Sequence, residues 1–195
     1  SLNDTFNLLI PTLSKYVDNK SVQRLKERLV DKTVDATPNI MVFGIYNAGK
    51  STFLNALIGE SRAKMADRPE TSVVTSYEWN GFKLLDTPGI DAPEAHERVS
   101  REQLEKTDII LFVLATDSGF EEKYVYQEII KIVKSHRLMM LIINNKNSYN
   151  EDEASYRAIY DKILVNLNKE GRESSLPSLA DNIQIHLVNA KSALK

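Results

Sequence analysis

The chain of 195 residues is 42% hydrophobic and 27% charged, a composition typical of a globular protein with one full core rather than of a disordered or fibrous one. Its net charge of −2 gives no reason to expect nucleic-acid binding through a broad basic face, and the absence of cysteine excludes disulfides and thiolate metal sites. The longest apolar runs, such as residues 109–115, are far too short to span a bilayer. The lack of cysteine is compatible with a cytosolic protein, and we expect a cytoplasmic one, with membrane association of the full-length protein as an open alternative.

The first part of the chain is predicted to be helical. Apolar residues recur at helical spacing in two stretches, 6–17 and 22–30, with a polar break at 18–21 between them. These helices either cover the sheet of the following domain or belong to a helical bundle whose other members lie outside this sequence. We therefore divide the chain into an N-terminal helical segment, 1–36, and a second domain, 37–195.

The second domain opens with a strand, a glycine-rich turn and a helix. Residues 39–43 are a short apolar run, and residues 44–51 read GIYNAGKS, which fits G-x-x-x-x-G-K-[ST]. Apolar residues then recur at helical spacing until Gly59. In such a loop the backbone N–H groups cradle the phosphates of a nucleotide, Lys50 reaches the β- and γ-phosphates, and the Ser51 hydroxyl holds Mg²⁺.

A hairpin follows. Residues 73–79 and 82–86 are two strands separated by Asn80 and Gly81, and Asn-Gly between such runs predicts an antiparallel pair with a type I′ turn.

Three more strands, at 107–116, 138–143 and 183–188, alternate with helices. Ser118 and Glu121 form a capping box that is predicted to open one helix, and Gly171 is predicted to end the next. The alternation predicts an α/β fold, a three-layer sandwich around a mainly parallel six-stranded sheet with one antiparallel hairpin strand.

The ligand of such a fold binds at the carboxyl ends of the strands, so the residues there are the candidates for chemistry. Asp86 at the end of the third strand is placed to hold Mg²⁺, and the Gly89 N–H to meet a γ-phosphate. Thr71, in the loop before the hairpin, offers a hydroxyl to the same Mg²⁺. Residues 144–148 read NNKNS, and residues 189–192 read NAKS.

With these motifs in order, the chain resembles a P-loop GTPase of the Era/TrmE-like and dynamin-like group over about residues 38–192. Residues 86–89 match its D-x-x-G motif, Asn145 and Lys146 take the place of N-K-x-D, which reads guanine, and Asn189 to Lys191 take the place of S-A-K. The resemblance implies the P-loop NTPase fold, Mg²⁺ as cofactor and a fixed set of site residues. Its nucleotide-binding candidates are Gly44, Asn47, Ala48, Gly49, Lys50, Ser51, Thr52, Gly89, Asn145, Lys146, Ser148, Asn189, Ala190 and Lys191. Its catalytic candidates are Lys50, Asn47 and Thr71, and its metal ligands are Ser51, Thr71 and Asp86.

Ser148 departs from the family pattern. The family has an aspartate there that accepts from two donors of guanine, a contact worth about 1–3 kcal/mol by analogy with base readout in DNA. The Asn145 amide, the Lys146 stem and the Ala190 N–H remain to favour GTP, and Asp152 offers another carboxylate. We expect GTP, with ATP or relaxed base specificity as the alternative.

Ile90 is the second departure, because many small GTPases carry a water-orienting glutamine directly after the motif glycine. The resemblance to GTPases with an apolar residue there implies that the missing catalytic element comes from elsewhere. In K⁺-dependent members an asparagine at the position of Asn47 helps to bind a cation that stabilises charge near the scissile bond. The alternative is that Asn47 only tolerates a tight turn.

The function implied is a GTP-binding switch that hydrolyses GTP to GDP and phosphate, with switch loops near 61–72 and 90–101. A dynamin-like protein would couple GTP to homodimerisation and membrane remodelling, and an Era-like one would act in ribosome or RNA assembly. The alternative is a regulatory nucleotide-binding module with little turnover that recruits a partner. Because this class normally follows its last motif with a further helix, we expect a GTPase domain of a larger protein.

Overall fold

The structure is a computed structural model, and it describes residues 37–60, 75–87, 104–117, 119–135, 137–146 and 154–193. The predicted helices before residue 37 lie outside these ranges, so the division between the two predicted domains stays a prediction.

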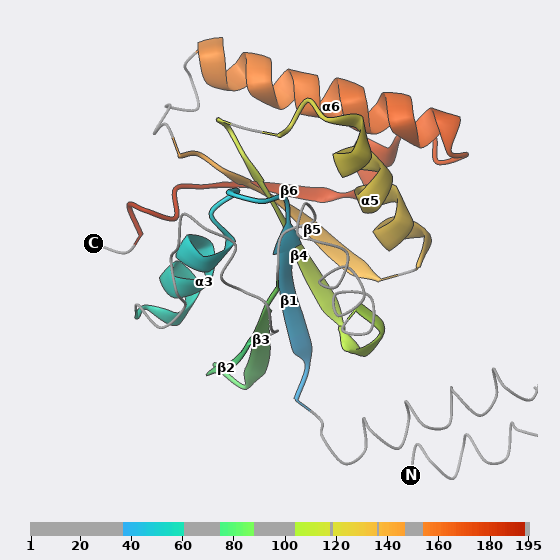
Figure 1. The fold of residues 1–195 in the computed structure, drawn as a ribbon. Helices are drawn as coiled ribbons and strands as arrows, with labels where there is room; N and C mark the ends of the chain where they lie inside the picture. Colours follow the sequence, from blue (N-terminus) through green and yellow to red (C-terminus); the bar gives the residue numbers. More distant parts are fainter. Residues whose placement is uncertain are drawn as a thin grey trace, which may run out of the picture. The chain divides into compact units, whose positions relative to one another are not determined.

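The described residues form a six-stranded sheet with helices around it (Figure 1). In chain order the elements are β1 (Asn39–Gly44), α3 (Lys50–Ile58), β2 (Thr75–Trp79), β3 (Phe82–Asp86), β4 (Ile109–Ala115), α5 (Lys123–Lys134), β5 (Leu138–Asn144), α6 (Ala154–Glu173), a 3₁₀ helix (Leu179–Asn182) and β6 (Gln184–Val188). The strand order is β2-β3-β1-β4-β5-β6, and every neighbouring pair is parallel except β2 and β3. The predicted α/β fold is therefore confirmed.

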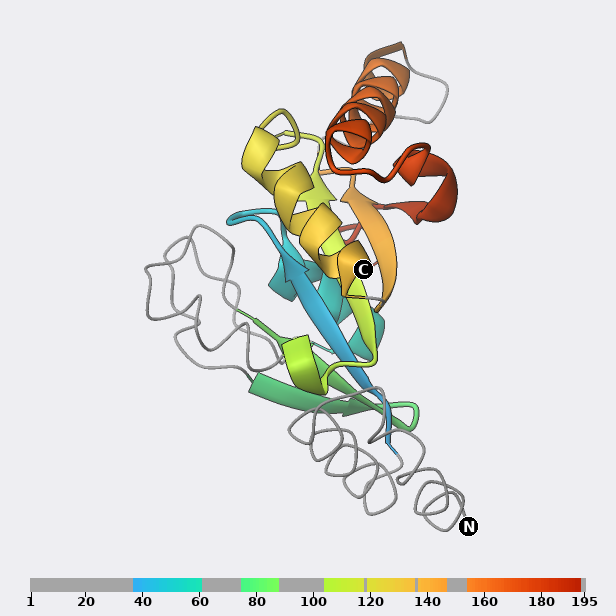
Figure 2. The same ribbon diagram turned by 90° about the vertical axis from the view of Figure 1, so that its right-hand side faces the viewer.

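Helices cover both faces of the sheet, with α3 on one side and α5 and α6 on the other (Figures 1 and 2). The central strands β1 and β4 are almost wholly buried, as their continuous apolar sequences require when both faces are covered. Because parallel strands end at the same edge, the residues that follow β1, β3, β4, β5 and β6 gather there.

The hairpin turn between β2 and β3 has the predicted chemistry. Asn80 and Gly81 both have left-handed backbones, with φ of 47° and 80°, as a type I′ turn requires. The register pairs Trp79 with Phe82 directly across the turn.

Two predicted helix boundaries are wrong. The helix α5 begins at Lys123 rather than after a capping box at Ser118, because Gly119 adopts φ of 74° and its carbonyl accepts from the Glu122 N–H, so the chain turns once more before the helix. The helix α6 continues past Gly171 to Glu173. A Cβ at Gly171 would lie 2.6 Å from the carbonyl oxygen of Leu176, so this glycine allows the returning chain to pack closely.

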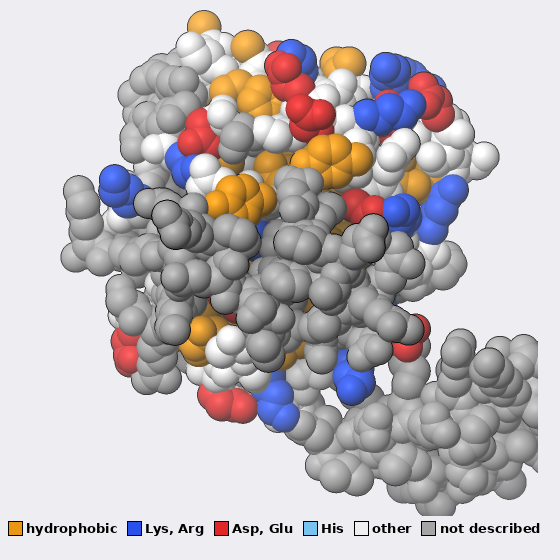
Figure 3. All heavy atoms as spheres, viewed as in Figure 1, with side chains coloured by type: hydrophobic (Ala, Val, Ile, Leu, Met, Phe, Trp, Pro, Cys, Tyr) orange, Lys and Arg blue, Asp and Glu red, His pale blue; other side chains and the backbone are white. Residues whose placement is uncertain are grey.

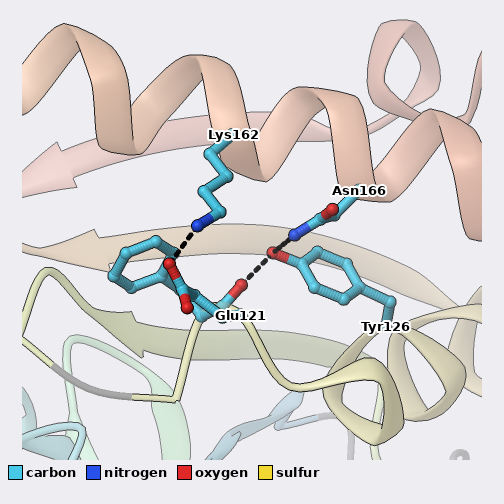
Figure 4. Close-up of polar contacts among 5 residues, drawn as sticks. Glu121, Tyr126, Lys162 and Asn166 are labelled. Carbon is cyan, nitrogen blue, oxygen red and sulfur yellow. Dashed lines mark hydrogen bonds and ion pairs between the residues drawn. The ribbon is translucent and has the colours of Figure 1, made fainter.

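Polar contacts tie α5 and the loop before it to α6 (Figure 4). The Tyr126 hydroxyl donates to the Phe120 carbonyl, and the Asn166 amide donates to the Tyr126 hydroxyl at 3.3 Å. Lys162 on α6 pairs with Glu121. Burial raises the pKa of Tyr126, and the Asn166 bond acts in the opposite direction.

Acidic and basic side chains are interspersed on the face in Figure 3, over the region where α6 runs, which agrees with the near-neutral net charge. No helix within the described ranges has the length and apolar character needed to cross a membrane.

Candidate nucleotide-binding site

The predicted phosphate loop lies between the end of β1 and the start of α3. Gly44 has φ of 139°, and a Cβ there would lie 2.2 Å from the Val113 carbonyl oxygen, so β1 and β4 can approach only at a glycine. Asn47 and Gly49 have left-handed backbones, with φ of 58° and 84°. Gly49 is the N-cap of α3 and makes no side-chain cap bond, so the N-terminus of the helix directly adjoins the loop, the arrangement found at anion sites.

Lys50 is the first residue of α3, and its side chain is buried inside the loop. Its ammonium group donates to the Ile45 carbonyl at 2.7 Å. This bond holds the positive charge within the turn that the predicted phosphates would occupy, as the sequence motif implies.

Ser51 and Asp86 come together at the start of α3. The Ser51 hydroxyl donates to Asp86 Oδ2 at 3.3 Å, and Asp86 is only 3% exposed. Burial raises the pKa of the Asp86 carboxyl, while the charge of Lys50 and the Ser51 hydroxyl act in the opposite direction. The Thr87 hydroxyl fixes the end of β3 by donating to the Val42 carbonyl at 2.8 Å.

Asp86 Oδ1 is buried and makes no hydrogen bond within the described residues. A buried carboxylate oxygen without a partner costs free energy unless a ligand meets it. Together with the Ser51 hydroxyl it offers the oxygen ligands that Mg²⁺ prefers, so these residues fit the predicted cation.

Asn144, the last residue of β5, is a site residue that the sequence interpretation missed. Its carboxamide donates to the Ala48 carbonyl at 3.0 Å and accepts from the Ala190 N–H at 3.3 Å. A Cβ at Gly49 would lie 2.4 Å from its Nδ2. One buried side chain thus joins the phosphate loop, β5 and the loop after β6. The only sequence signal was a polar residue at the end of an apolar strand.

The residues predicted to read the base lie at the same edge. Asn145 is buried, and its N–H donates to the Val188 carbonyl at 2.7 Å, which joins the ends of β5 and β6. Lys146 donates to the Asn47 carbonyl at 2.9 Å and pairs with Asp117, a residue that the sequence interpretation also missed, at 3.0 Å. The Ala190 N–H, expected to favour guanine, is engaged by Asn144 here.

The other predicted nucleotide-binding residues lie at the start of α3 and in the turn after β6. Thr52 lies in the first turn of α3, and the Asn189 side chain accepts from the Ser192 N–H at 3.0 Å in the turn that also carries Lys191. The predicted roles of Thr71, Gly89, Ile90, Ser148 and Asp152 fall on residues outside the described ranges.

Residues 39–169, which are more than half of the chain, match the family described as 50S ribosome-binding GTPase. The chain belongs to this GTPase family. The match confirms the interpretation of the motifs as those of a P-loop GTPase of the Era/TrmE-like and dynamin-like group. The family match also assigns the chain to an enzyme class, the GTPases.

Two relatives lie in the same group. The tRNA modification GTPase MnmE of Thermotoga maritima is 28% identical over 169 residues, which cover 75% of this chain and 37% of the relative. The GTPase Era of Alkaliphilus metalliredigens is 32% identical over 125 residues, which cover 58% of this chain and 41% of the relative. The chain thus matches less than half the length of either protein.

Solved structures share the fold at low identity. A structure of an oligomerised bacterial dynamin pair superposes with a TM-score of 0.67 at 17% identity, over 98% of this chain and 45% of that one. Toc33 from Arabidopsis thaliana, in a dimerisation-deficient mutant, gives 0.58 at 16% identity, over 90% of this chain and 81% of that one. Era bound to MgGDPNP and a segment of 16S ribosomal RNA gives 0.58 at 20% identity, over 80% and 52%.

Proposed function

We propose that the chain is the nucleotide-binding domain of a larger switch GTPase, and that it binds Mg²⁺·GTP at the loop 44–51 and hydrolyses it to GDP and phosphate. The observation that carries this proposal is that the buried Lys50 and the half-buried Ser51, at the start of α3, lie beside the buried Asp86 at the end of β3. The family match supports guanine as the base.

Each of these residues has a defined task in the proposed reaction. The Lys50 ammonium, held in the loop by the Ile45 carbonyl, would carry its positive charge to the β- and γ-phosphate oxygens. The N–H groups at the start of α3 stabilise the negative charge that develops on the transferring group. Ser51, Asp86 and Thr71 would hold Mg²⁺, which would supply further charge neutralisation at the phosphates.

The switch follows from contacts to the γ-phosphate. Thr71 and Gly89 are proposed to meet this phosphate or its Mg²⁺, each from one of the two predicted switch loops. Its loss on hydrolysis would release both loops together.

Base recognition rests on Asn145 and Lys146 in this proposal. With a serine at 148 in place of the family's aspartate, we expect GTP to be preferred over ATP by a smaller margin than in a GTPase that keeps the acid. At 1.4 kcal/mol per tenfold, a lost contact of about 1–3 kcal/mol corresponds to a five- to over a hundredfold loss of preference.

Hydrolysis requires a catalytic element that Ile90 does not provide. We propose that K⁺ bound with the help of Asn47, or a second copy of the chain facing the nucleotide, supplies it. The exposed, left-handed Asn47 supports the first source, since its side chain lies at the surface of the phosphate loop.

Two cellular roles are proposed for the full-length protein. The fold shared with the bacterial dynamin pair favours membrane remodelling with nucleotide-dependent dimers, and the relationship to Era favours ribosome or RNA assembly. Either role would use regions outside the part that matches, and either places the domain in the cytoplasm. A helical bundle or an RNA-binding domain in the longer gene product would decide between them.

A single-turnover assay tests the reaction. Protein at rising concentration is mixed with limiting Mg²⁺·GTP in K⁺ or Na⁺ buffer, and phosphate release is measured. We expect release that is faster in K⁺ or rises with protein concentration. Binding without phosphate release in either buffer and at any concentration would instead support the regulatory nucleotide-binding module.

A further inference from the structure

The loop between β4 and α5 is connected to the phosphate loop once directly and once through Lys146. Gly119 lies against the Ile45 side chain so closely that a Cβ would come within 2.1 Å of Ile45 Cδ1. Two residues earlier, the Asp117 carboxylate lies 3.0 Å from the Lys146 ammonium. The first contact is steric, whereas the second is ionic and reaches the phosphate loop through Lys146.

The Lys146 ammonium group lies between the Asp117 carboxylate and the Asn47 carbonyl of the phosphate loop. Its ammonium nitrogen lies 2.9 Å from the Asn47 carbonyl oxygen and 3.0 Å from Asp117 Oδ2. The backbone fixes both charged residues, because the Thr116 and Lys146 N–H groups both donate to the Asn144 carbonyl, at 3.1 and 2.9 Å. The side chains of Lys146 and Asp117 remain 27% and 32% exposed.

A partly exposed ion pair of this kind contributes little to the stability of the fold. The ion pair has a more specific effect on the conformation of the phosphate loop, because Lys146 binds the carbonyl of Asn47. The φ of Asn47, 58°, is uncommon for a residue other than glycine. The Asp117 carboxylate, 3.0 Å from the ammonium group, favours this position of the Lys146 side chain over one turned to water.

Side chains at the end of β5 donate hydrogen bonds to two consecutive carbonyls of the phosphate loop. Lys146 binds the carbonyl of Asn47, and Asn144 binds that of Ala48. In a trans peptide unit the C=O of one residue and the N–H of the next point in opposite directions. Fixing these two carbonyls therefore fixes the directions of the Ala48 and Gly49 N–H groups, which belong to the predicted phosphate cradle. In this structure the Ala48 N–H makes a long bond of 3.4 Å to the Ile45 carbonyl, within the same loop.

We propose that Asp117 is a positioning residue for nucleotide binding. Its carboxylate keeps the Lys146 ammonium on the Asn47 carbonyl, and this contact orients the peptide unit between Asn47 and Ala48 for phosphate. Asp117 does not touch the nucleotide. This inference rests on the proposed function, since it assigns a device that prepares the same site.

The first test measures nucleotide affinity. In Asp117→Asn we expect the Kd values for GDP, GTP and ATP to rise together by about fivefold, as one contact of about 1 kcal/mol would give. Glu121→Gln is the matched control, because Glu121 lies in the same loop but pairs with Lys162 on α6. Unchanged affinity in Asp117→Asn, or a loss confined to guanine nucleotides, would overturn the inference.

A double-mutant cycle tests whether Asp117 acts through Lys146. In a Lys146→Met background we expect Asp117→Asn to cause no further loss of affinity for GDP. An undiminished loss in that background contradicts the inference.

Hydrogen exchange of the nucleotide-free protein separates this inference from the proposed function. We expect the Ala48 and Gly49 amides to exchange faster in Asp117→Asn and in Lys146→Met than in the wild type and in Glu121→Gln. If the wild type binds no nucleotide, the proposed function fails, and this exchange pattern still decides the inference. Equal exchange rates in all four proteins would overturn it.

Discussion

Asn144 and Ala48 lie 96 residues apart in the chain, and the Asn144 carboxamide donates to the Ala48 carbonyl at 3.0 Å in the interior of the protein. The same carboxamide accepts from the Ala190 N–H. The phosphate loop therefore takes its shape partly from β5 and from the loop after β6, and not from its own glycines alone.

Replacement of Asn144 by alanine tests this link. Asn144→Ala leaves the Ala48 carbonyl and the Ala190 N–H buried without these partners, so we expect the free energy of unfolding to fall by about 2–3 kcal/mol. Chemical denaturation measures it. Asn182→Ala is the control, because its exposed side chain makes one bond to the Ser178 carbonyl, and a change within about 0.5 kcal/mol is expected. Equal effects of the two substitutions would show that the link carries no stability.

Gly49 is expected to tolerate no side chain. In Gly49→Ala the new Cβ would lie 2.4 Å from Asn144 Nδ2 on a backbone with φ of 84°. We expect overpacking to lower the free energy of unfolding by about 1–3 kcal/mol, in addition to the cost of backbone strain, and we expect GDP binding to be lost. Gly81→Ala has nearly the same φ, 80°, but open space, so it isolates the strain. A Gly49→Ala protein as stable as Gly81→Ala, with normal GDP affinity, would contradict this.

The Asp86 carboxylate is expected to lower the stability of the metal-free protein and to be needed for Mg²⁺ binding. Since burial raises the pKa of its carboxyl, the native state disfavours the charged form. In metal-free and nucleotide-free protein we therefore expect Asp86→Asn to raise the melting temperature at neutral pH. The gain should disappear as the pH falls through the raised pKa of Asp86, because the carboxyl is then neutral in the wild type as well.

The same variant should lose Mg²⁺ dependence. We expect the Mg²⁺ concentration for half-maximal GTP binding to rise about tenfold or more in Asp86→Asn. Asp161→Asn, an exposed residue of α6, controls for the charge change and should alter neither property. An Asp86→Asn protein that needs no more Mg²⁺ than the wild type would remove Asp86 from the metal site.

Tyr126 should stabilise the junction of α5 and α6. Tyr126→Phe removes the bond to the Phe120 carbonyl, so we expect a loss of about 1–2 kcal/mol in unfolding free energy. Because burial raises the pKa of Tyr126, wild-type stability should also fall as the pH rises above the usual range of tyrosine, and the variant should lack this component. Denaturation at neutral and alkaline pH measures both effects. A variant with wild-type stability at neutral pH would remove this hydroxyl from the junction.

Much of the fold could be predicted because its signals are local. The apolar runs of β1, β4 and β5, the Asn-Gly turn and the sequence GIYNAGKS each specify a structure with little help from the rest of the chain. Because the carboxyl ends of parallel strands share one edge of the sheet, the sequence predicts that Ser51 and Asp86 lie close together, and in the structure the Ser51 hydroxyl lies 3.3 Å from Asp86 Oδ2.

The error at Gly171 came from a local contact, and the two omitted site residues make contacts between distant segments. Gly171 looked like a helix end, but its lack of a side chain serves close packing against Leu176. Asn144 and Asp117 looked like ordinary residues after apolar strands, since their partners, Ala48 and Lys146, lie on other elements. Side-chain bonds of this kind leave no periodic pattern in the sequence.

Competition between nucleotides is the most direct measurement of guanine binding at the loop 44–51. Fluorescently labelled GDP is bound to the chain with Mg²⁺ and displaced by GTP or by ATP, in the wild type and in Lys50→Ala. We predict tight binding to the wild type, displacement by GTP at lower concentration than by ATP, and loss of binding in Lys50→Ala. Displacement by ATP at equal or lower concentration, or unchanged binding by Lys50→Ala, would contradict this account.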